Sequence, residues 1–195
     1  MTRKEQKEER RKNILMNALR LFVERGYYDT RISDIAEAAQ MSTGLMFHYF
    51  ESKEELLTEL VRMGAEGTKA AGREMGDIPP DVYLTEFLRR MFSFAKEQPW
   101  VFNMFVLMGQ VRRAGMPEEA RKAAEAVDTV ERTAKLIEQG QKSGVFHKGD
   151  ALIMSRCFWA SVQGIMEEMA MDKEMKAPEP EWIVAMLKAG SGDED

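Results

Sequence analysis

The sequence predicts an all-α protein, and three observations carry that prediction. Apolar residues recur at three- and four-residue spacing through most of the chain, which is typical of amphipathic helices. Proline and glycine separate these apolar stretches, as expected at helix ends. No stretch shows the apolar-polar alternation of a β-strand. We therefore expect about nine helices, arranged as an N-terminal three-helix unit with a helix-turn-helix and a C-terminal helical region.

The N-terminal elements follow from their breakers and caps. An apolar stripe over residues 14–23 defines the first helix, which Gly26 ends. A tight turn at Gln40 separates two short helices, and Ser52 with Glu55 forms a capping box that starts a longer helix. The predicted helices here cover residues 8–25, 31–39, 43–49 and a segment from 52.

The C-terminal elements are separated mainly by proline. A glycine-rich break around Gly64, Gly67, Gly72 and Gly76 is expected to follow the fourth helix. Pro80, Pro99 and Pro117 suit the first turns of helices, because the N–H group that proline lacks would be unpaired there. The predicted helices in this region cover residues 81–97, 99–113, 117–141, 150–171 and 181–189.

Composition restricts the class of protein. The chain has 195 residues, of which 44% are hydrophobic and 31% charged, so it can bury a core. It has no apolar run of about 20 residues and no signal-like N-terminus, so we expect a cytoplasmic protein without a membrane partner. Cys157 is the single cysteine, and His48 and His147 are the two histidines. These counts argue against a disulfide framework, a metal site or a cofactor.

Positive charge gathers at the N-terminal end. The net charge is −5, but residues 1–53 hold ten Lys and Arg against eight Asp and Glu, which leaves 18 against 25 for the remainder. The N-terminal region is therefore where a polyanion would bind. Residues 2–12 contain six basic side chains interrupted by acidic ones. Two interpretations of this run stay open: an arm that reaches phosphates or a neighbouring groove, and a frayed tail.

Residues 30–57 carry the most informative pattern. Two short helices joined by a tight turn bury little surface alone, so they need the stripe of the first helix as a third wall. The second short helix then projects outward. Hydroxyl, imidazole and phenol groups suit phosphate oxygens and base edges, and glycine lets a backbone approach a duplex. That helix carries Thr43, Gly44, Phe47, His48 and Tyr49. The alternative interpretation is an exposed aromatic edge of a helical core.

The segment IAEAAQMSTGLMFHYFESKEELL resembles the signature of the tetracycline-repressor (TetR) family. The first helix with its GYYDT exit is similar more loosely, and IEQGQKSGVFHKGDALIMSRCFWASVQGIM looks like that family's loop and dimerisation helix. The resemblance implies a homodimer that binds palindromic double-stranded DNA as a transcriptional regulator, with a small apolar effector releasing it as a repressor. It also implies a DNA-binding domain over residues 1–53 and an effector-binding and dimerisation domain over 54–190. Composition predicts a disordered tail over 191–195.

The resemblance also implies which side chains meet DNA. Lys53 would contact a phosphate, while Met46 and Phe50 would belong to the core. The residues expected at the DNA are Thr30, Ser42, Thr43, Gly44, Phe47, His48, Tyr49 and Lys53. Two departures from the family pattern affect these contacts. Gln40 stands where the family usually has a left-handed glycine, and Phe47 stands where it usually has a tyrosine.

The helix over residues 150–171 has two apolar arcs. The broad arc, which includes Met154 and Phe158, is expected to face the chain's own core. The narrow arc holds small residues that permit close approach, so we expect a partner subunit to cover it. Burial of both arcs inside one subunit is the alternative. The predicted dimer interface comprises Ile153, Cys157, Ala160, Gly164, Trp182 and Met186.

Large, soft side chains are concentrated in the middle of the chain and on the helix over 150–171. Flexible methionines and flat aromatic rings suit an adaptable pocket for an apolar ligand, although the same residues also build ordinary core. The predicted ligand-binding residues are Met63, Phe92, Trp100, Met104, Phe105, Met108, Phe158, Val162 and Met166.

Two other classes of function compete with a DNA-binding regulator. A small helical hydrolase or transferase finds no support, because the chain has no GxSxG or HExxH motif and no glycine-rich phosphate loop after a strand. We therefore expect no enzymatic activity. An interaction or architectural protein that uses the helix-turn-helix without sensing a small molecule stays open as the alternative.

Overall fold

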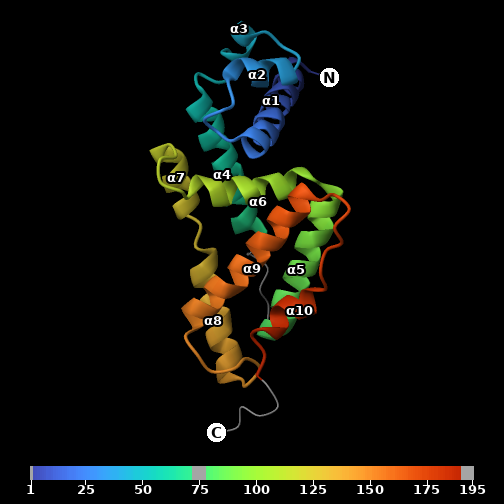
Figure 1. The fold of residues 1–195 in the computed structure, drawn as a ribbon, viewed down its shortest axis with the longest axis vertical. Helices are drawn as coiled ribbons and strands as arrows, with labels where there is room; N and C mark the ends of the chain where they lie inside the picture. Colours follow the sequence, from blue (N-terminus) through green and yellow to red (C-terminus); the bar gives the residue numbers. More distant parts are fainter. Residues whose placement is uncertain (1, 72–77, 190–195) are drawn as a thin grey trace. The chain divides into compact units, whose positions relative to one another are not determined.

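The computed structural model describes residues 2–71 and 78–189, and within these ranges it is helical, which confirms the all-α prediction (Figure 1). One isolated antiparallel bridge joins Phe146 and Lys188. No helix in the described part of the chain has the length and apolar character needed to cross a membrane. The helices are α1 (Arg3–Arg25), α2 (Ile32–Ala38), α3 (Thr43–Met46), α4 (Lys53–Ala71), α5 (Pro80–Glu97), α6 (Trp100–Val111), α7 (Glu118–Glu125), α8 (Thr129–Lys142), α9 (Ala151–Met171) and α10 (Pro180–Ala185).

The chain forms two compact units. Unit 1 comprises Met1–Gly67 and Asn103–Ala126, and unit 2 comprises Thr68–Phe102 and Val127–Asp195. Helices α4 and α6 each begin in one unit and end in the other, because the boundaries at Gly67 and Phe102 fall within them. The predicted disordered tail, residues 191–195, lies outside the described residues.

The core of unit 1 is built on α1. Its apolar stripe buries Ile14, Leu19 and Phe22 completely, and α2 packs against it through Ile35 and Ala36 (Figure 1). These residues form the third wall that the sequence predicted for the helix-turn-helix. The helix also begins at Arg3 rather than near residue 8. A capping box explains the earlier start, because the hydroxyl of Thr2 accepts from Glu5 N at 3.2 Å and Thr2 N donates to the Glu5 carboxylate at 2.8 Å.

Helix α4 runs through Gly64 and Gly67 to Ala71, so neither of these two glycines breaks it, while Gly72 and Gly76 lie outside the described residues. The reason for a glycine at position 64 is close packing: a Cβ there would lie 2.9 Å from Met104 Sδ and 3.0 Å from Met108 Sδ on α6. The single helix expected over residues 117–141 is instead α7 and α8. On one continuous helix, Ile137 would lie about 140° around from Ala124, at about 100° per residue. Both residues are fully buried, so the chain breaks between them and changes the buried face.

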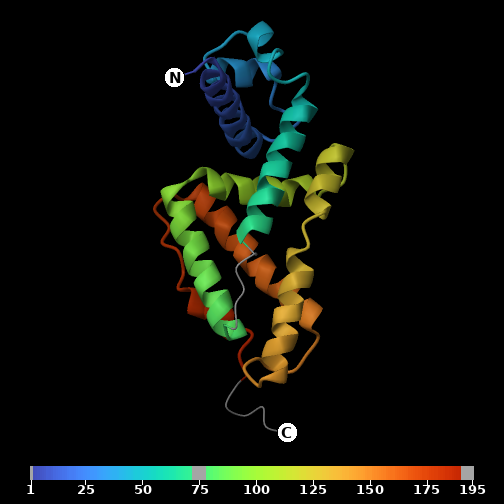
Figure 2. The ribbon, with the colours of Figure 1, turned by 180° about the vertical axis from the view of Figure 1, so that it is seen from behind.

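Unit 2 packs α9 against α8, and α10 against α5 and α9 (Figure 2). Phe158, Val162 and Met166 on α9 are completely buried, which confirms the broad arc as core. The corner between α8 and α9 is fixed by Phe146, whose ring lies directly against Gly140 and leaves no room for a Cβ. Helix α10 ends at Ala185, earlier than predicted, and the bridge to Phe146 follows it.

Candidate nucleic-acid interface and small-molecule pocket

The short helix α3 is held firmly at both ends. The hydroxyl of Ser42 caps it by accepting from Leu45 N at 3.2 Å. Met46 and Phe50 are both 1% exposed and anchor it to the core, as the resemblance implied. Beyond it the backbone hydrogen bonds join residues three apart rather than four, from His48 N to Leu45 O and from Tyr49 N to Met46 O. The predicted helix over 43–49 is therefore one α-helical turn followed by a tight turn.

The outward side of α3 presents the predicted reading residues. Thr43, Gly44 and His48 are exposed, Phe47 is 50% exposed, and Tyr49 is half-buried. No heavy atom lies within 4 Å of the position that a Cβ on Gly44 would occupy, so its backbone faces open space. The segment thus combines hydroxyl, imidazole and aromatic groups on one accessible surface, as a base-reading element requires.

The turn before α3 is left-handed at Gln40, although a non-glycine residue there was expected to alter the turn. Gln40 has φ 56°, a value that no other non-glycine residue matches within the described ranges. The turn is closed by backbone bonds from Gln40 N to Glu37 O at 3.0 Å and from Met41 N to Ala36 O at 3.0 Å. Glutamine therefore takes the strained position that the family usually gives to glycine.

Thr30 and Lys53 do not lie on this exposed surface. Thr30 is completely buried, and its hydroxyl lies 2.8 Å from Gly26 O and 3.1 Å from Leu21 O. The ammonium of Lys53 donates to Tyr27 O at 2.8 Å and Thr30 O at 2.9 Å, with Tyr28 O at 3.5 Å. It also lies 4.4 Å from the centre of the Tyr27 ring.

These contacts give both residues a structural role in this conformation. An ammonium has three N–H donors, and three carbonyls of the turn between α1 and α2 surround that of Lys53. Burial lowers the pKa of Lys53. A buried Thr30 side chain cannot touch a duplex, so the expected Thr30 contact does not fit this structure. The phosphate contact of Lys53 stays a prediction.

The basic N-terminal run is helical from Arg3 rather than frayed, and its contact with phosphates or a neighbouring groove stays a prediction. Arg11, at its end, donates to the Glu59 carboxylate at 2.9 Å and lies 4.7 Å from the centre of the Phe50 ring. The hydrogen bond to Glu59 raises the pKa of Arg11. Tyr28, which follows α1, donates its hydroxyl to Gly115 O and so ties the turn after α1 to the segment after α6.

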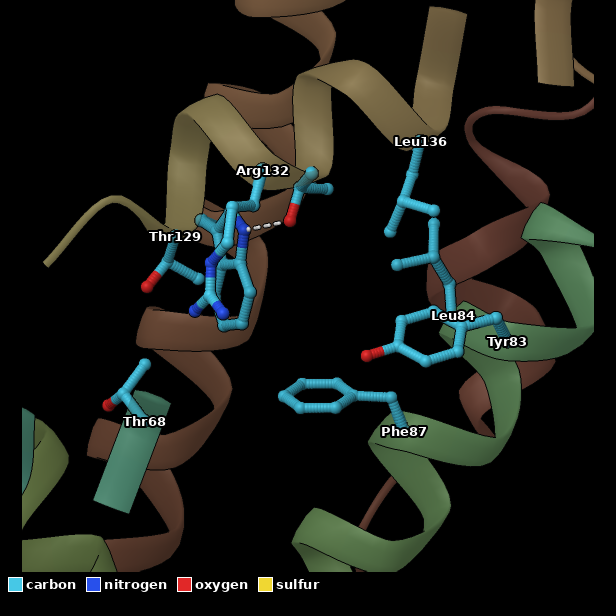
Figure 3. Close-up of a pocket in the computed structure, with 9 residues that line it drawn as sticks. Thr68, Tyr83, Leu84, Phe87, Thr129, Arg132 and Leu136 are labelled. Atoms are coloured by element: carbon cyan, nitrogen blue, oxygen red, sulfur yellow. Dashed lines mark hydrogen bonds between the residues drawn. The ribbon is translucent and has the colours of Figure 1, made fainter. Parts of the chain in front are cut away.

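A pocket lies within unit 2, between side chains from four helices (Figure 3). Trp159 of α9 donates its indole N–H to the Thr133 hydroxyl at 2.9 Å on one wall. Tyr83 and Phe87 of α5 stack with ring centres 6.3 Å apart, and Phe87 meets Trp159 edge-on at 5.9 Å. The cavity is about 40 Å³. Its lining residues are Thr68, Tyr83, Leu84, Phe87, Thr129, Arg132, Thr133, Leu136 and Trp159.

None of the nine predicted ligand-binding residues lines this pocket. Four of them belong to unit 1, namely Met63, Met104, Phe105 and Met108. The other five belong to unit 2, namely Phe92, Trp100, Phe158, Val162 and Met166. Most are buried core. The overlooked signal was the polar series Thr129, Arg132 and Thr133 at helical spacing beside Leu136, in a stretch for which only the bounds of a helix had been predicted. The described residues contain no group of three or more His, Cys, Asp or Glu side chains placed to hold a metal ion.

The narrow arc of α9 lies on the surface. Ile153 is 51% exposed, and Trp182 and Met186 of the C-terminal segment are 70% and 43% exposed. Cys157, Ala160 and Gly164 are exposed as well, with open space where a Cβ of Gly164 would stand. All six predicted dimer-interface residues are therefore uncovered in the single chain.

A capped α3 at the end of a three-helix core, with polar and aromatic groups facing outward, defines a protein of the helix-turn-helix class. Residues 14–60 match the family model for bacterial regulatory proteins of the tetR family. The helix-turn-helix region of the chain is therefore similar to that of the tetR family.

Individual relatives agree with the family. The transcriptional regulator HbdR of Aromatoleum sp. (strain CIB) is 50% identical over 50 residues, which span 26% of this chain and only 22% of HbdR. The regulator PfmR of Thermus thermophilus is 27% identical, with a TM-score of 0.68 over 88% of this chain and 93% of PfmR. AibR, solved with isovaleryl coenzyme A and operator DNA, has the same fold at 19% identity, with a TM-score of 0.72 over 92% of this chain and 98% of AibR.

Proposed function

We propose that this protein is a transcriptional repressor that binds a palindromic operator as a homodimer and releases it when a small molecule binds. The observation that carries the proposal is the exposed surface of α3, where Thr43, Gly44, Phe47 and His48 face outward from a fixed core. The match of residues 14–60 to the model for bacterial regulatory proteins of the tetR family supports a role in regulating transcription in the cytoplasm. The alternative is an interaction or architectural protein that uses the helix-turn-helix without a small-molecule effector. Operator release by a ligand distinguishes the two.

The dimer part of the proposal rests on the uncovered arc of α9. Ile153 and Trp182 expose large apolar surface, and Gly164 gives a partner helix room to approach. A helix that is apolar on two sides must be covered on two sides. A second copy of the chain would cover this arc and present two α3 helices for the two halves of a palindrome.

The effector part of the proposal rests on the pocket of unit 2. AibR supports this pairing of functions, because that protein was solved with both an acyl thioester and operator DNA. A ligand releases DNA only if it prefers one conformation of the protein to another. Helices α4 and α6 continue from unit 2 into unit 1, so a shift of either helix would reach the unit that holds α3.

Selection of bound sequences from random double-stranded DNA tests the DNA part. We expect an inverted repeat whose half-sites lie about one turn of DNA, 34–36 Å, apart, and an affinity that falls steeply with salt. Thr43→Ala should weaken binding to the selected sequence by about 1–3 kcal/mol and reduce discrimination. Ser93→Ala removes an exposed hydroxyl from α5 and serves as the control. Selection that yields no inverted repeat would show that the protein is not a regulator of this type.

Sedimentation of the purified protein tests the dimer. We expect a dimer at micromolar concentration, and Gly164→Leu should weaken it by about 1–3 kcal/mol through overpacking of the contact. Gly67→Leu is the matched control, because Gly67 is also helical and exposed with open space around its Cβ position. A wild-type monomer at micromolar concentration would overturn this part of the proposal.

A further inference from the structure

The pocket of unit 2 contains one charged side chain, and it is a cation. Arg132 extends from α8 toward the pocket, whereas no acidic residue is among the nine that line it (Figure 3). Its Nε lies 3.1 Å from Asp128 Oδ1, in an ion pair one helical turn away. The two terminal nitrogens of the guanidinium have no hydrogen-bond or ion-pair partner within residues 2–71 and 78–189. They form a fork of donors that suits a carboxylate.

Hydroxyl groups add further donors around the same space. In Figure 3 the hydroxyl of Tyr83 points into the pocket from α5, across from Arg132. Burial raises the pKa of Tyr83, while the charges of Arg132 and Arg90 act in the opposite direction, so this hydroxyl is protonated and lies close to two cations. The Thr133 hydroxyl accepts from Trp159, which leaves its own hydrogen to donate. The polar lining is therefore suited to an anion.

The remaining lining is apolar and flat. Tyr83, Phe87 and Trp159 form a continuous series of stacked and edge-on rings, with Leu84 and Leu136 beside them. The aromatic ring of a ligand could pack favourably against these rings, either stacked or edge-on. The cavity of about 40 Å³ holds only about three water molecules in this conformation. A ligand must therefore be small, and the aromatic side chains must move outward to admit its ring.

We propose that the effector of this pocket is a small aromatic monocarboxylate, whose carboxylate binds the guanidinium of Arg132 and whose ring joins the Tyr83, Phe87 and Trp159 series. This inference rests on the proposed function and assigns its ligand class. A cationic ligand would be repelled by Arg132 and Arg90, and no acidic side chain is among the nine lining residues to bind it. A neutral ligand would leave the guanidinium fork unused, so charge on the ligand is the feature that the pocket selects.

Titration of the full-length protein with benzoate, 4-methylbenzoate and phenylacetate tests the proposal, with each matching amide as the neutral isostere. Trp159 lies in the pocket and reports binding by its fluorescence, and calorimetry measures the same affinities. We expect saturable binding of at least one acid, at least tenfold tighter than its amide. Equal binding of acid and amide, or no binding of any acid at millimolar concentration, would overturn the proposal.

Charge variants on α8 assign the effect to one side chain. Arg132→Gln should weaken binding of the acid at least tenfold, which corresponds to about 1.4 kcal/mol, and leave binding of the amide unchanged. Arg132→Lys should restore part of the affinity, because it restores the charge without the planar fork. Lys135→Gln removes a charge from an exposed position of the same helix and should change nothing. Loss of acid binding in Lys135→Gln, or its retention in Arg132→Gln, would contradict the assignment.

Operator release, measured at the same ligand concentrations, separates this inference from the proposed function. If an acid binds through Arg132 without changing operator affinity, the ligand class stands and ligand-controlled repression fails. If a neutral apolar compound releases the operator equally well from wild-type protein and Arg132→Gln, regulation stands and the ligand class fails. Circular dichroism and the operator affinity of unliganded Arg132→Gln establish that the variant is folded.

Discussion

Lys53 in unit 1 and Arg132 in unit 2 are both cations near the start of a helix, yet the two units use them differently. The ammonium of Lys53 is surrounded by three backbone carbonyls of the turn after α1. The guanidinium of Arg132 has one carboxylate partner, Asp128, and turns its terminal nitrogens toward a pocket. Unit 1 uses its buried polar groups to hold its own backbone, which fixes the surface that would read DNA. Unit 2 leaves donors available, as a ligand site requires.

The largest expected effect tests this contrast directly. Lys53→Met keeps the length of the side chain but leaves the carbonyls of Tyr27 and Thr30 without their charged donor. Hydrogen bonds to charged groups contribute about 1.5–3 kcal/mol, so we expect a loss of up to about 3 kcal/mol in the free energy of unfolding. Arg132→Gln should cost less than about 1 kcal/mol, because the ion pair is 34% and 60% exposed on its two sides.

Urea unfolding followed by circular dichroism measures both variants, and hydrogen exchange of the amides between α1 and α2 locates the loss. Lys53→Met should also weaken binding to every DNA sequence, since the support of α3 is disturbed. Equal destabilisation by the two substitutions would show that the two cations stabilise the fold to the same extent, which would contradict the contrast between the units. If Lys53→Met is as stable as the wild type but binds DNA more weakly, the result would instead support the phosphate contact that the family resemblance implies for Lys53.

The sequence predicted the α1 stripe and the exposed α3, because each depends on a local pattern. Periodicity within a helix decides which residues are buried, and a cap or a turn residue decides where the helix ends. The expected start near residue 8 failed for a local reason as well, since the capping box of Thr2 and Glu5 was present but overlooked.

The role of Lys53 and the location of the pocket depend instead on contacts between distant segments. Lys53 meets Tyr27 and Thr30 across 26 and 23 residues. The pocket needs α4, α5, α8 and α9 together, and the apolar residues chosen for it from composition became core. The break between α7 and α8 also required knowing which face each helix buries. No periodicity within one segment contains that information.

Alkaline pH gives a second test of the contacts around Lys53 in unit 1, because the ring of Tyr27 lies against its ammonium. Burial raises the pKa of Tyr27 from 10.0 to about 12, with the nearby charge of Glu54 as the second cause. A raised pKa in the folded state means that the stabilisation is fully present below pH 10 and is lost as pH rises toward 12. We expect a loss on the order of 2 kcal/mol over this range, at about 1.4 kcal/mol per pKa unit.

Tyr27→Phe is the matched variant for this measurement, because it keeps the ring under Lys53 and removes the titrating group. The free energy of unfolding of the variant should fall less between pH 10 and pH 12 than that of the wild type. Tyrosinate absorbance should meanwhile show one late-ionising tyrosine fewer in the folded variant than in the folded wild-type protein, because Tyr83, whose pKa burial also raises, is present in both. Parallel pH profiles for the two proteins would contradict the assignment to Tyr27.

The smallest expected effect concerns Gln40, and it sharpens the claim that buried contacts, rather than the turn itself, fix α3. A non-glycine residue in the left-handed region costs about 1–2 kcal/mol, and glycine would remove that strain. Glycine also gives the unfolded chain more freedom, which offsets about 0.4–1 kcal/mol. Gln40→Gly should therefore change the free energy of unfolding by less than about 1 kcal/mol, toward stabilisation. Gln40→Ala removes the same polar group but keeps the strain, so glycine should be the more stable of the two variants. Because Ser42, Met46 and Phe50 hold α3 without help from Gln40, operator affinity should stay within threefold of wild type, roughly 0.6 kcal/mol. A larger change in affinity for Gln40→Gly would show that the strained turn itself sets the orientation of α3.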